Sequence, residues 1–216
     1  MEDSNKQNNI QNNNDIQTSD LIALQHMLTE AADPVASLYH EQCIDPVALH
    51  FIPESAWTSQ NLSLHSLHED YFGRKNNLNR RFEHKLWNAL RITLTFPAMV
   101  KLVGVVWVTD SIIKVYKFAF AKLLNISAID GGLFHKQGNF TRHGFVILSD
   151  SEAKLKVPAD QLADVDYHDV LLITHAQQNF TISSTEATIS QCKWDNPSGA
   201  TRVASLRIEN IQENQN

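Results

Sequence analysis

The 216-residue chain lacks the features that mark secreted, membrane-spanning or cysteine-stabilised proteins. Its two cysteines, Cys43 and Cys192, lie far apart without a CxxC spacing, which argues against a disulfide framework and a cysteine zinc site. The amino terminus lacks the basic, apolar and small-residue order of a secretory signal. Uncharged runs in the central region, such as ITLTFPAMV (92–100), reach only about half of a membrane span. We therefore predict a soluble intracellular protein without a membrane partner.

The sequence also lacks the short motifs of common enzyme classes. No glycine-rich phosphate loop follows a strand, and neither a nucleophile motif nor HExxH occurs. Asp166, His168 and Asp169 stand together in VDYHDV, but a surface strand edge explains them better than catalysis does. His65 and His68 have no third metal ligand nearby, so a solvated helix face is the better interpretation. We predict no enzymatic activity, no metal site and no cofactor.

Positive charge is concentrated in one third of the chain. The net charge is −10 over residues 1–73, +9 over residues 74–145 and −5 over residues 146–216, which together give −6. Twelve of the 18 lysines and arginines lie in the middle segment. Such a distribution is typical of a module that binds a polyanion between acidic flanks. In the alternative, the basic segment docks on the acidic flanks within the fold, and charge alone does not separate the two.

Composition divides the chain into five segments. Asparagine and glutamine dominate the first, which predicts disorder because too few side chains could be buried. Helical spacing and proline breaks in the second predict one helix that ends before Pro34 and another from Pro34 to about Gln42. The segments are a disordered tail (1–18), an acidic helical flank (19–73), a basic domain (74–150), a β-rich extension or small module (151–210) and a polar tail (211–216).

The basic domain shows an ordered series of elements. RRFEHKLWNALRI (80–92) is a predicted helix with Phe82, Leu86, Trp87 and Leu90 on one stripe. Pro97 opens a short helix that Gly104 closes in the left-handed conformation. Further along, β-branched residues and helical spacing predict a strand (105–117), a helix (118–126), a three-residue turn (127–129), a helix capped by Asp130 (130–143) and a strand (145–149).

This order of elements is typical of a winged helix-turn-helix, in which the last helix enters the major groove of DNA. In DGGLFHKQGNFTRHGF (130–145), Leu133, Phe140 and Phe145 can pack inward. Asparagine and glutamine can bond adenine, and arginine or lysine can bond guanine. Gly131, Gly132 and Gly138 each lower helix stability by about 1 kcal/mol at an interior site, yet they let the backbone approach phosphate. The predicted base-contacting residues are Lys136, Gln137, Asn139, Thr141 and Arg142.

The run from Arg81 to Leu148 resembles the initiator-binding domain of protist core-promoter-binding proteins. The resemblance lies in RFEHKLWNALRI, in KLVGVVWVTDSIIKVYKFAFAKLLNI and in the asparagine-bearing helix that ends in HGF. The Gly-Phe close is also similar to that of heat-shock factor recognition helices. The resemblance implies an ETS-like winged helix that binds duplex DNA and turns Gln137, Asn139 and Arg142 toward the groove.

We therefore expect an α+β fold, with a winged helix-turn-helix core, a helical N-terminal flank and a β-rich C-terminal extension. The expected function is sequence-specific binding of double-stranded DNA as a nuclear, initiator-like core-promoter transcription factor. The acidic flanks are candidate surfaces for proteins of the transcription machinery. The alternative is a winged-helix protein-interaction module that binds no DNA. The residues expected to contact the DNA backbone are Arg80, Arg81, Lys85, Lys117, Lys122 and His135.

Overall fold

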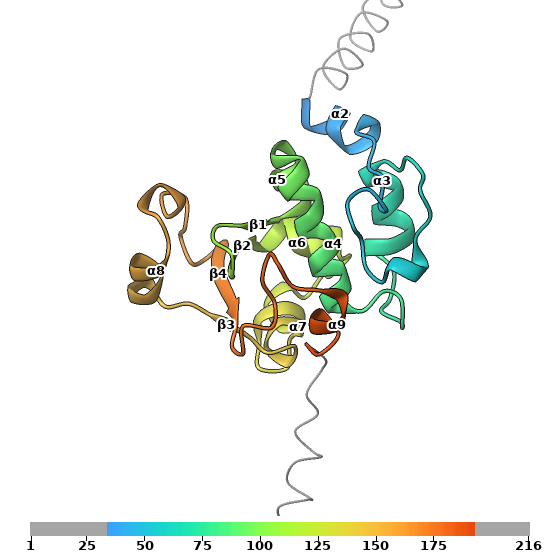
Figure 1. The fold of residues 1–216 in the computed structure, drawn as a ribbon. Coiled ribbons are helices and arrows are strands. Elements are labelled where there is room, and N and C mark those ends of the chain that lie inside the picture. Colours follow the sequence, from blue (N-terminus) through green and yellow to red (C-terminus); the bar gives the residue numbers. More distant parts are fainter. Residues whose placement is uncertain (1–33, 193–216) are drawn as a thin grey trace, which may run out of the picture.

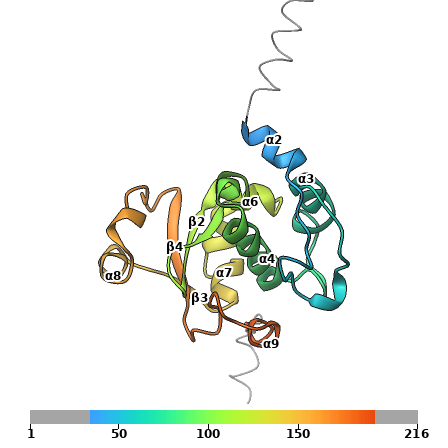
Figure 2. The same ribbon diagram turned by 45° about the horizontal axis from the view of Figure 1, so that its top comes forward.

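The computed structural model describes residues 34–192, and the helix expected before Pro34 lies outside this range. The fold is α+β, as expected, with a four-stranded antiparallel sheet among helices (Figure 1). In both ribbon views, α2 (Pro34–Glu41) and α3 (Leu64–Leu67) lie at one end and α8 (Asp150–Lys156) at the other (Figures 1 and 2). The sheet and α4 (Phe82–Thr95) lie between them.

Most helices expected in the basic domain are present. α4 covers the first predicted helix, and a turn of 3₁₀ helix at Pro97 leads into the short α5 (Val100–Val103). The predicted left-handed Gly104 is confirmed, with φ 80°. A Cβ there would lie 2.2 Å from the Phe120 amide nitrogen, so only glycine fits. The remaining helical elements are η1 (Glu54–Ala56), η2 (His68–Phe72), η3 (Pro97–Met99), α6 (Lys117–Leu123), η4 (Asp130–Phe134), α7 (Asn139–Arg142), η5 (Ala159–Gln161) and α9 (Glu186–Ile189).

The prediction of a single strand over residues 105–117 is wrong. The chain instead forms a hairpin of β1 (Val105–Trp107) and β2 (Ile112–Tyr116), which pair antiparallel. The hydroxyl of Thr109 accepts a hydrogen bond from the Ile112 amide at 3.1 Å and thereby stabilises the turn. Threonine and serine hydroxyls form such local turns, which β-propensity alone does not predict.

The sheet is completed by a strand from the C-terminal third. β4 (Val170–His175) pairs with both β2 and β3 (Phe145–Ile147), and the strand order is β1-β2-β4-β3. The run DVLLITHA (169–176), in the segment expected to be β-rich, therefore contains a strand. ATISQCKW (187–194), which has β-like composition, instead begins inside α9, whose N-cap Thr185 accepts a hydrogen bond from the Thr188 amide. The division of the chain into five segments stays a prediction.

Helix α4 is the centre of the core and is buried on almost every side. The expected stripe of Phe82, Leu86, Trp87 and Leu90 is buried, but so are the polar side chains between them. Asn88 bridges to the N-terminal flank: its side chain accepts from the Ile52 amide at 2.8 Å and donates to the Ile52 carbonyl at 2.9 Å. The flank thus covers the face of α4 that an amphipathic pattern would leave in water.

Candidate nucleic-acid interface

The 130–145 segment is not the continuous helix expected over residues 130–143. It consists of the single turn η4, an irregular stretch from His135 to Gly138, and the four-residue α7. His135 and Gly138 are both extended, with ψ 164° and 165°. Gly138 packs so closely on the preceding turn that a Cβ would lie 2.5 Å from the Leu133 carbonyl carbon. Gly138 therefore allows the broken helix to fold its two turns against each other.

The apolar side chains of this segment pack inward as expected. Leu133, Phe140 and Phe145 are buried. Phe140 lies at the centre of an aromatic cluster, edge-on to Phe82 at 5.0 Å and stacked on Phe134 at 5.2 Å between ring centroids. Such contacts fix the segment on α4 and the sheet although its helical content is small.

The residues predicted to contact bases differ in exposure. Lys136, Gln137 and Thr141 are exposed, whereas Asn139 and Arg142 are half-buried. The Asn139 side chain donates to the Gly132 carbonyl at 3.0 Å and so ties α7 to η4. Arg142 donates to the Gln137 side-chain oxygen at 3.5 Å. The broken helix therefore presents the predicted residues from a loop and a single helical turn.

Of the residues predicted to contact phosphate, His135, within this segment, and Lys122, on α6, are exposed. Lys117 is engaged within the fold: its ammonium forms an ion pair with Asp130 at 2.9 Å and lies 5.7 Å from the centroid of the Phe134 ring. Its side chain is 12% exposed. Lys117 thus holds the first turn of the 130–145 segment in place.

The two predicted phosphate contacts at the start of α4 are engaged as well. Arg81 forms an ion pair with the buried Glu83 at 3.1 Å and donates to His84 Nε2 at 2.7 Å. Lys85 is buried and donates to the Arg74 carbonyl at 2.5 Å. Burial, followed by the positive charge of Arg80, lowers the pKa of Lys85 to about 8.

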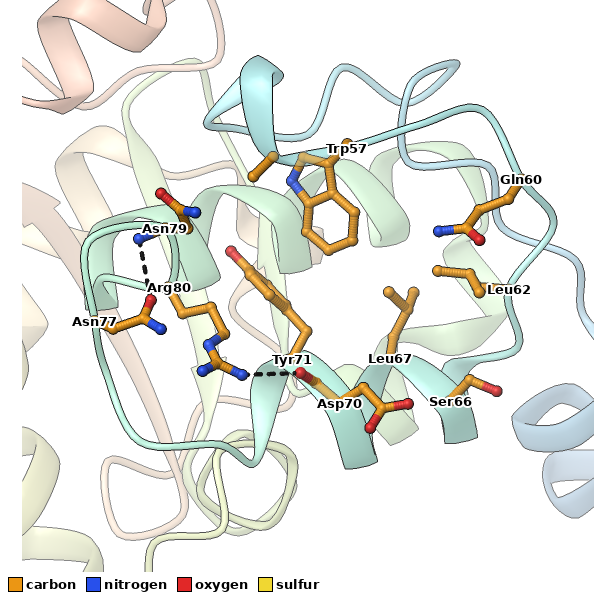
Figure 3. Close-up of a pocket in the computed structure, with 11 residues that line it drawn as sticks. Trp57, Gln60, Leu62, Ser66, Leu67, Asp70, Tyr71, Asn77, Asn79 and Arg80 are labelled. Atoms are coloured by element: carbon orange, nitrogen blue, oxygen red, sulfur yellow. Dashed lines mark hydrogen bonds between the residues drawn. The ribbon is translucent and has the colours of Figure 1, made fainter.

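Arg80 lies at a different surface from the 130–145 segment. It donates to the Asp70 carbonyl at 3.1 Å and lines a cavity of about 530 Å³ (Figure 3). Trp57 and Tyr71, with ring centroids 4.8 Å apart, form an aromatic wall of this cavity, and Asn77 and Asn79 lie beside Arg80 (Figure 3). No residue of the 130–145 segment lines it.

A second cavity, of about 260 Å³, lies beside α7 and is strongly basic; we call it the basic cavity. Sequence reasoning missed most of its polar residues, although the run RKNN (74–77) brings two cations and two amides together. Asn139, the first residue of α7, connects the cavity to the 130–145 segment. Its lining residues are Gly73, Arg74, Lys75, Asn76, Phe82, Lys85, Leu124, Asn125, Ile126 and Asn139.

The VDYHDV motif forms a turn that starts β4. The Asp166 carboxylate accepts from the amides of Asp169 at 2.7 Å and Val170 at 3.1 Å, and these bonds lower its pKa. His168 contacts Asp169 at 2.5 Å on the exposed surface. Within residues 34–192, no three histidine, cysteine, aspartate or glutamate side chains cluster closely enough to hold a metal ion. Over the same range, no helix has the length and apolar character needed to cross a membrane.

A comparison with protein-family models matches residues 54–164 to the transcription-initiator DNA-binding domain, IBD. The chain belongs to this family. The initiator-binding match covers the residues that line both cavities and the whole 130–145 segment. It ends before β4. Membership supports a DNA-binding role in transcription, and the family is not one of enzymes. No curated protein and no solved structure matches the chain.

Proposed function

We propose that this initiator-binding-domain protein binds double-stranded DNA sequence-specifically, as a nuclear core-promoter transcription factor. The observation that carries the proposal is the exposure of Lys136, Gln137 and Thr141 on one segment inside the family match. Lysine and glutamine are among the side chains that distinguish base edges in the major groove. Arg142, beside Gln137, would complete the reading surface.

The order of elements supports a winged-helix docking mode. α4 and α5 are followed by the β1–β2 hairpin and then by α6 and α7, and β3 pairs antiparallel with β4 across the long connection 148–169. In this mode the broken 130–145 segment occupies the place of the recognition helix, and the long connection 148–169 occupies the place of the wing. Asn139 would act mainly by shaping the segment, because its side-chain amide is bonded to Gly132.

The basic character of the middle segment supports electrostatic anchoring. Lys122 and His135 are exposed and would contact phosphates, together with other cations close to the 130–145 segment. Arg81 and Lys117 would contribute through their positive potential and through the fold, since both form ion pairs with protein groups. The acidic N-terminal flank covers α4, and its outer surface is the proposed contact for transcription proteins.

The test is selection of duplexes from a random library with the full chain, followed by fluorescence anisotropy. Gln137→Ala should reduce the preference for the selected site by about 1–3 kcal/mol, the contribution of one base contact. Binding to unrelated duplexes should stay unchanged. Gln191→Ala, at an exposed position outside the segment, is the matched control. Equal binding of all duplexes would exclude sequence-specific reading.

A protein-interaction role is the second candidate, and one observation favours it. β3 is an edge strand, and its Val146 and Ile147 side chains are 45% and 46% exposed. Exposed edge strands can pair with a strand of a partner. Absence of DNA binding by the full chain at low salt would favour this role over the first.

A further inference from the structure

We propose that the basic cavity binds one phosphate group, and that in the DNA complex this group is a phosphodiester of the backbone. The inference rests on the proposed function and assigns a specific anchor to it. The cavity has a volume of about 260 Å³ and is lined by the 73–76 loop, α4, the turn after α6 (124–126) and the start of α7.

The chemistry of the lining suits a phosphate. Its charged side chains are Arg74, Lys75 and Lys85, and the lining contains no carboxylate. Guanidinium, ammonium and amide groups all donate hydrogen bonds, and charged donors form the strongest bonds to phosphate oxygens. Arg74 also pairs with Asp70 at 3.4 Å, but both side chains are exposed to water, so this pair competes only weakly. The amide side chains of the lining are Asn76, Asn125 and Asn139.

Lys85 provides an independent observation. Its residue is 3% exposed, and its ammonium donates to the Arg74 carbonyl but forms no ion pair with any residue in 34–192. An ammonium group is costly to bury without an opposite charge. A phosphate in the cavity would supply that charge, and two N–H groups of Lys85 beyond the Arg74 bond could donate to it.

The position of the cavity fits a DNA backbone contact. Asn139 lines the cavity and also begins α7, so a phosphate bound there would lie next to the residues proposed to read bases. Contacts to phosphates fix the register of a protein on duplex DNA. The cavity would therefore determine how the 130–145 segment enters the groove.

The experiment inserts a negative charge at the cavity of the full chain. Asn125 has φ 55°, a conformation that aspartate also tolerates, so Asn125→Asp should keep the fold. Asn61→Asp adds the same charge at an exposed site outside the cavity and is the matched control. In anisotropy titrations with the selected duplex, Asn125→Asp should weaken binding about tenfold more than Asn61→Asp does.

A second pair of variants measures the phosphate contact directly. Lys75→Gln should reduce the slope of log affinity against log salt by about 0.9, the value for one neutralised phosphate. Lys101→Gln, an exposed lysine on α5 outside the cavity, should leave the slope unchanged. Equal effects within both pairs of variants would overturn the cavity assignment, while salt-dependent binding by the wild type would leave the proposed function intact.

Two further outcomes separate the possible sources of phosphate. If the wild type binds no duplex at low salt, the proposed function fails and the backbone assignment fails with it. Calorimetric titration with inorganic phosphate tests the other source. Binding of inorganic phosphate that Asn125→Asp abolishes, with DNA affinity unaffected, would overturn the backbone assignment in favour of a free phosphate ligand.

Discussion

The 130–145 segment and helix α4 are both rich in polar side chains, but they place them differently. In the 130–145 segment, Lys136 and Gln137 extend into solvent while phenylalanines below them pack into the core. In α4, Lys85 and Asn88 are buried, and each is bonded to the backbone of the N-terminal flank or the loop after it. Charge counted along the chain therefore overstates the number of exposed cations, because some of them, such as Arg81 and Lys117, form ion pairs within the fold.

The largest effect that would test this contrast is expected at Asn88. Asn88→Ala removes the hydrogen bonds to both backbone groups of Ile52, which leaves the buried Ile52 amide without a partner and its carbonyl with only the long 3.5 Å bond from Trp57 Nε1. An unsatisfied buried group costs about 1–3 kcal/mol, so we expect a loss of about 3 kcal/mol in the free energy of unfolding. Urea denaturation followed by tryptophan fluorescence measures it. Asn61→Ala, at an exposed position, should change stability by less than about 0.5 kcal/mol.

A smaller effect on stability should distinguish the roles of Asn139 and Gln137 in the 130–145 segment. Asn139→Ala removes the bond to the Gly132 carbonyl and should lower stability by about 1 kcal/mol as well as weaken DNA binding. Gln137→Ala should weaken DNA binding with stability unchanged, because Gln137 is exposed. Thermal unfolding and anisotropy on the same samples compare them. Equal stability of the two variants would show that Asn139 does not hold the segment together.

A further effect, which depends on pH, is expected in α4. Burial, followed by the charge of Arg81, lowers the pKa of His84 to about 4. The unfolded state, with an ordinary pKa near 6.5, therefore binds more protons between these values. This group's contribution to stability is complete above about pH 6.5 and is lost as the pH falls toward 4. Glutamine can still accept the hydrogen bond from Arg81 but does not titrate.

Unfolding free energies of the wild type and His84→Gln, measured from pH 8 to pH 4, test this expectation. The difference between the two proteins should be constant above about pH 6.5 and should change in favour of the variant below it. A difference that stays constant over the whole range would mean that His84 titrates normally in the folded protein.

Local signals in the sequence predicted much of the fold. These signals each arise within a single helix or strand. They are the periodicity of residues 80–92, Pro97 and Gly104 at the two ends of a short helix, and the β-branched and apolar run DVLLITHA. The break in the 130–145 segment depends on Gly138 packing against the Leu133 backbone, which no periodicity reports. The resemblance to initiator-binding domains is confirmed.

The candidate site was less predictable than the fold. The types of exposed residues in the 130–145 segment follow from its apolar spacing, which placed Leu133 and Phe140 inward. The hydrogen bonds of Lys85 and Arg81 depend on distant segments: Lys85 donates to the loop at Arg74, and Arg81 donates to Ser190, which follows α9. The basic cavity joins the 73–76 loop, α4, the turn after α6 and α7, so only the folded chain brings its cations and amides together.

The position of β4 has a consequence for how the protein is made. Ile112 in β2 pairs with Thr174, and Phe145 in β3 pairs with His175. Both strands therefore need β4, which comes later in the chain, to complete their pairing. During synthesis, β2 and β3 emerge from the ribosome before their common partner does. Unpaired strand edges promote association with other chains, and pairing over long sequence separations is slow. The nascent chain is therefore expected to need chaperone protection until residue 175 has emerged.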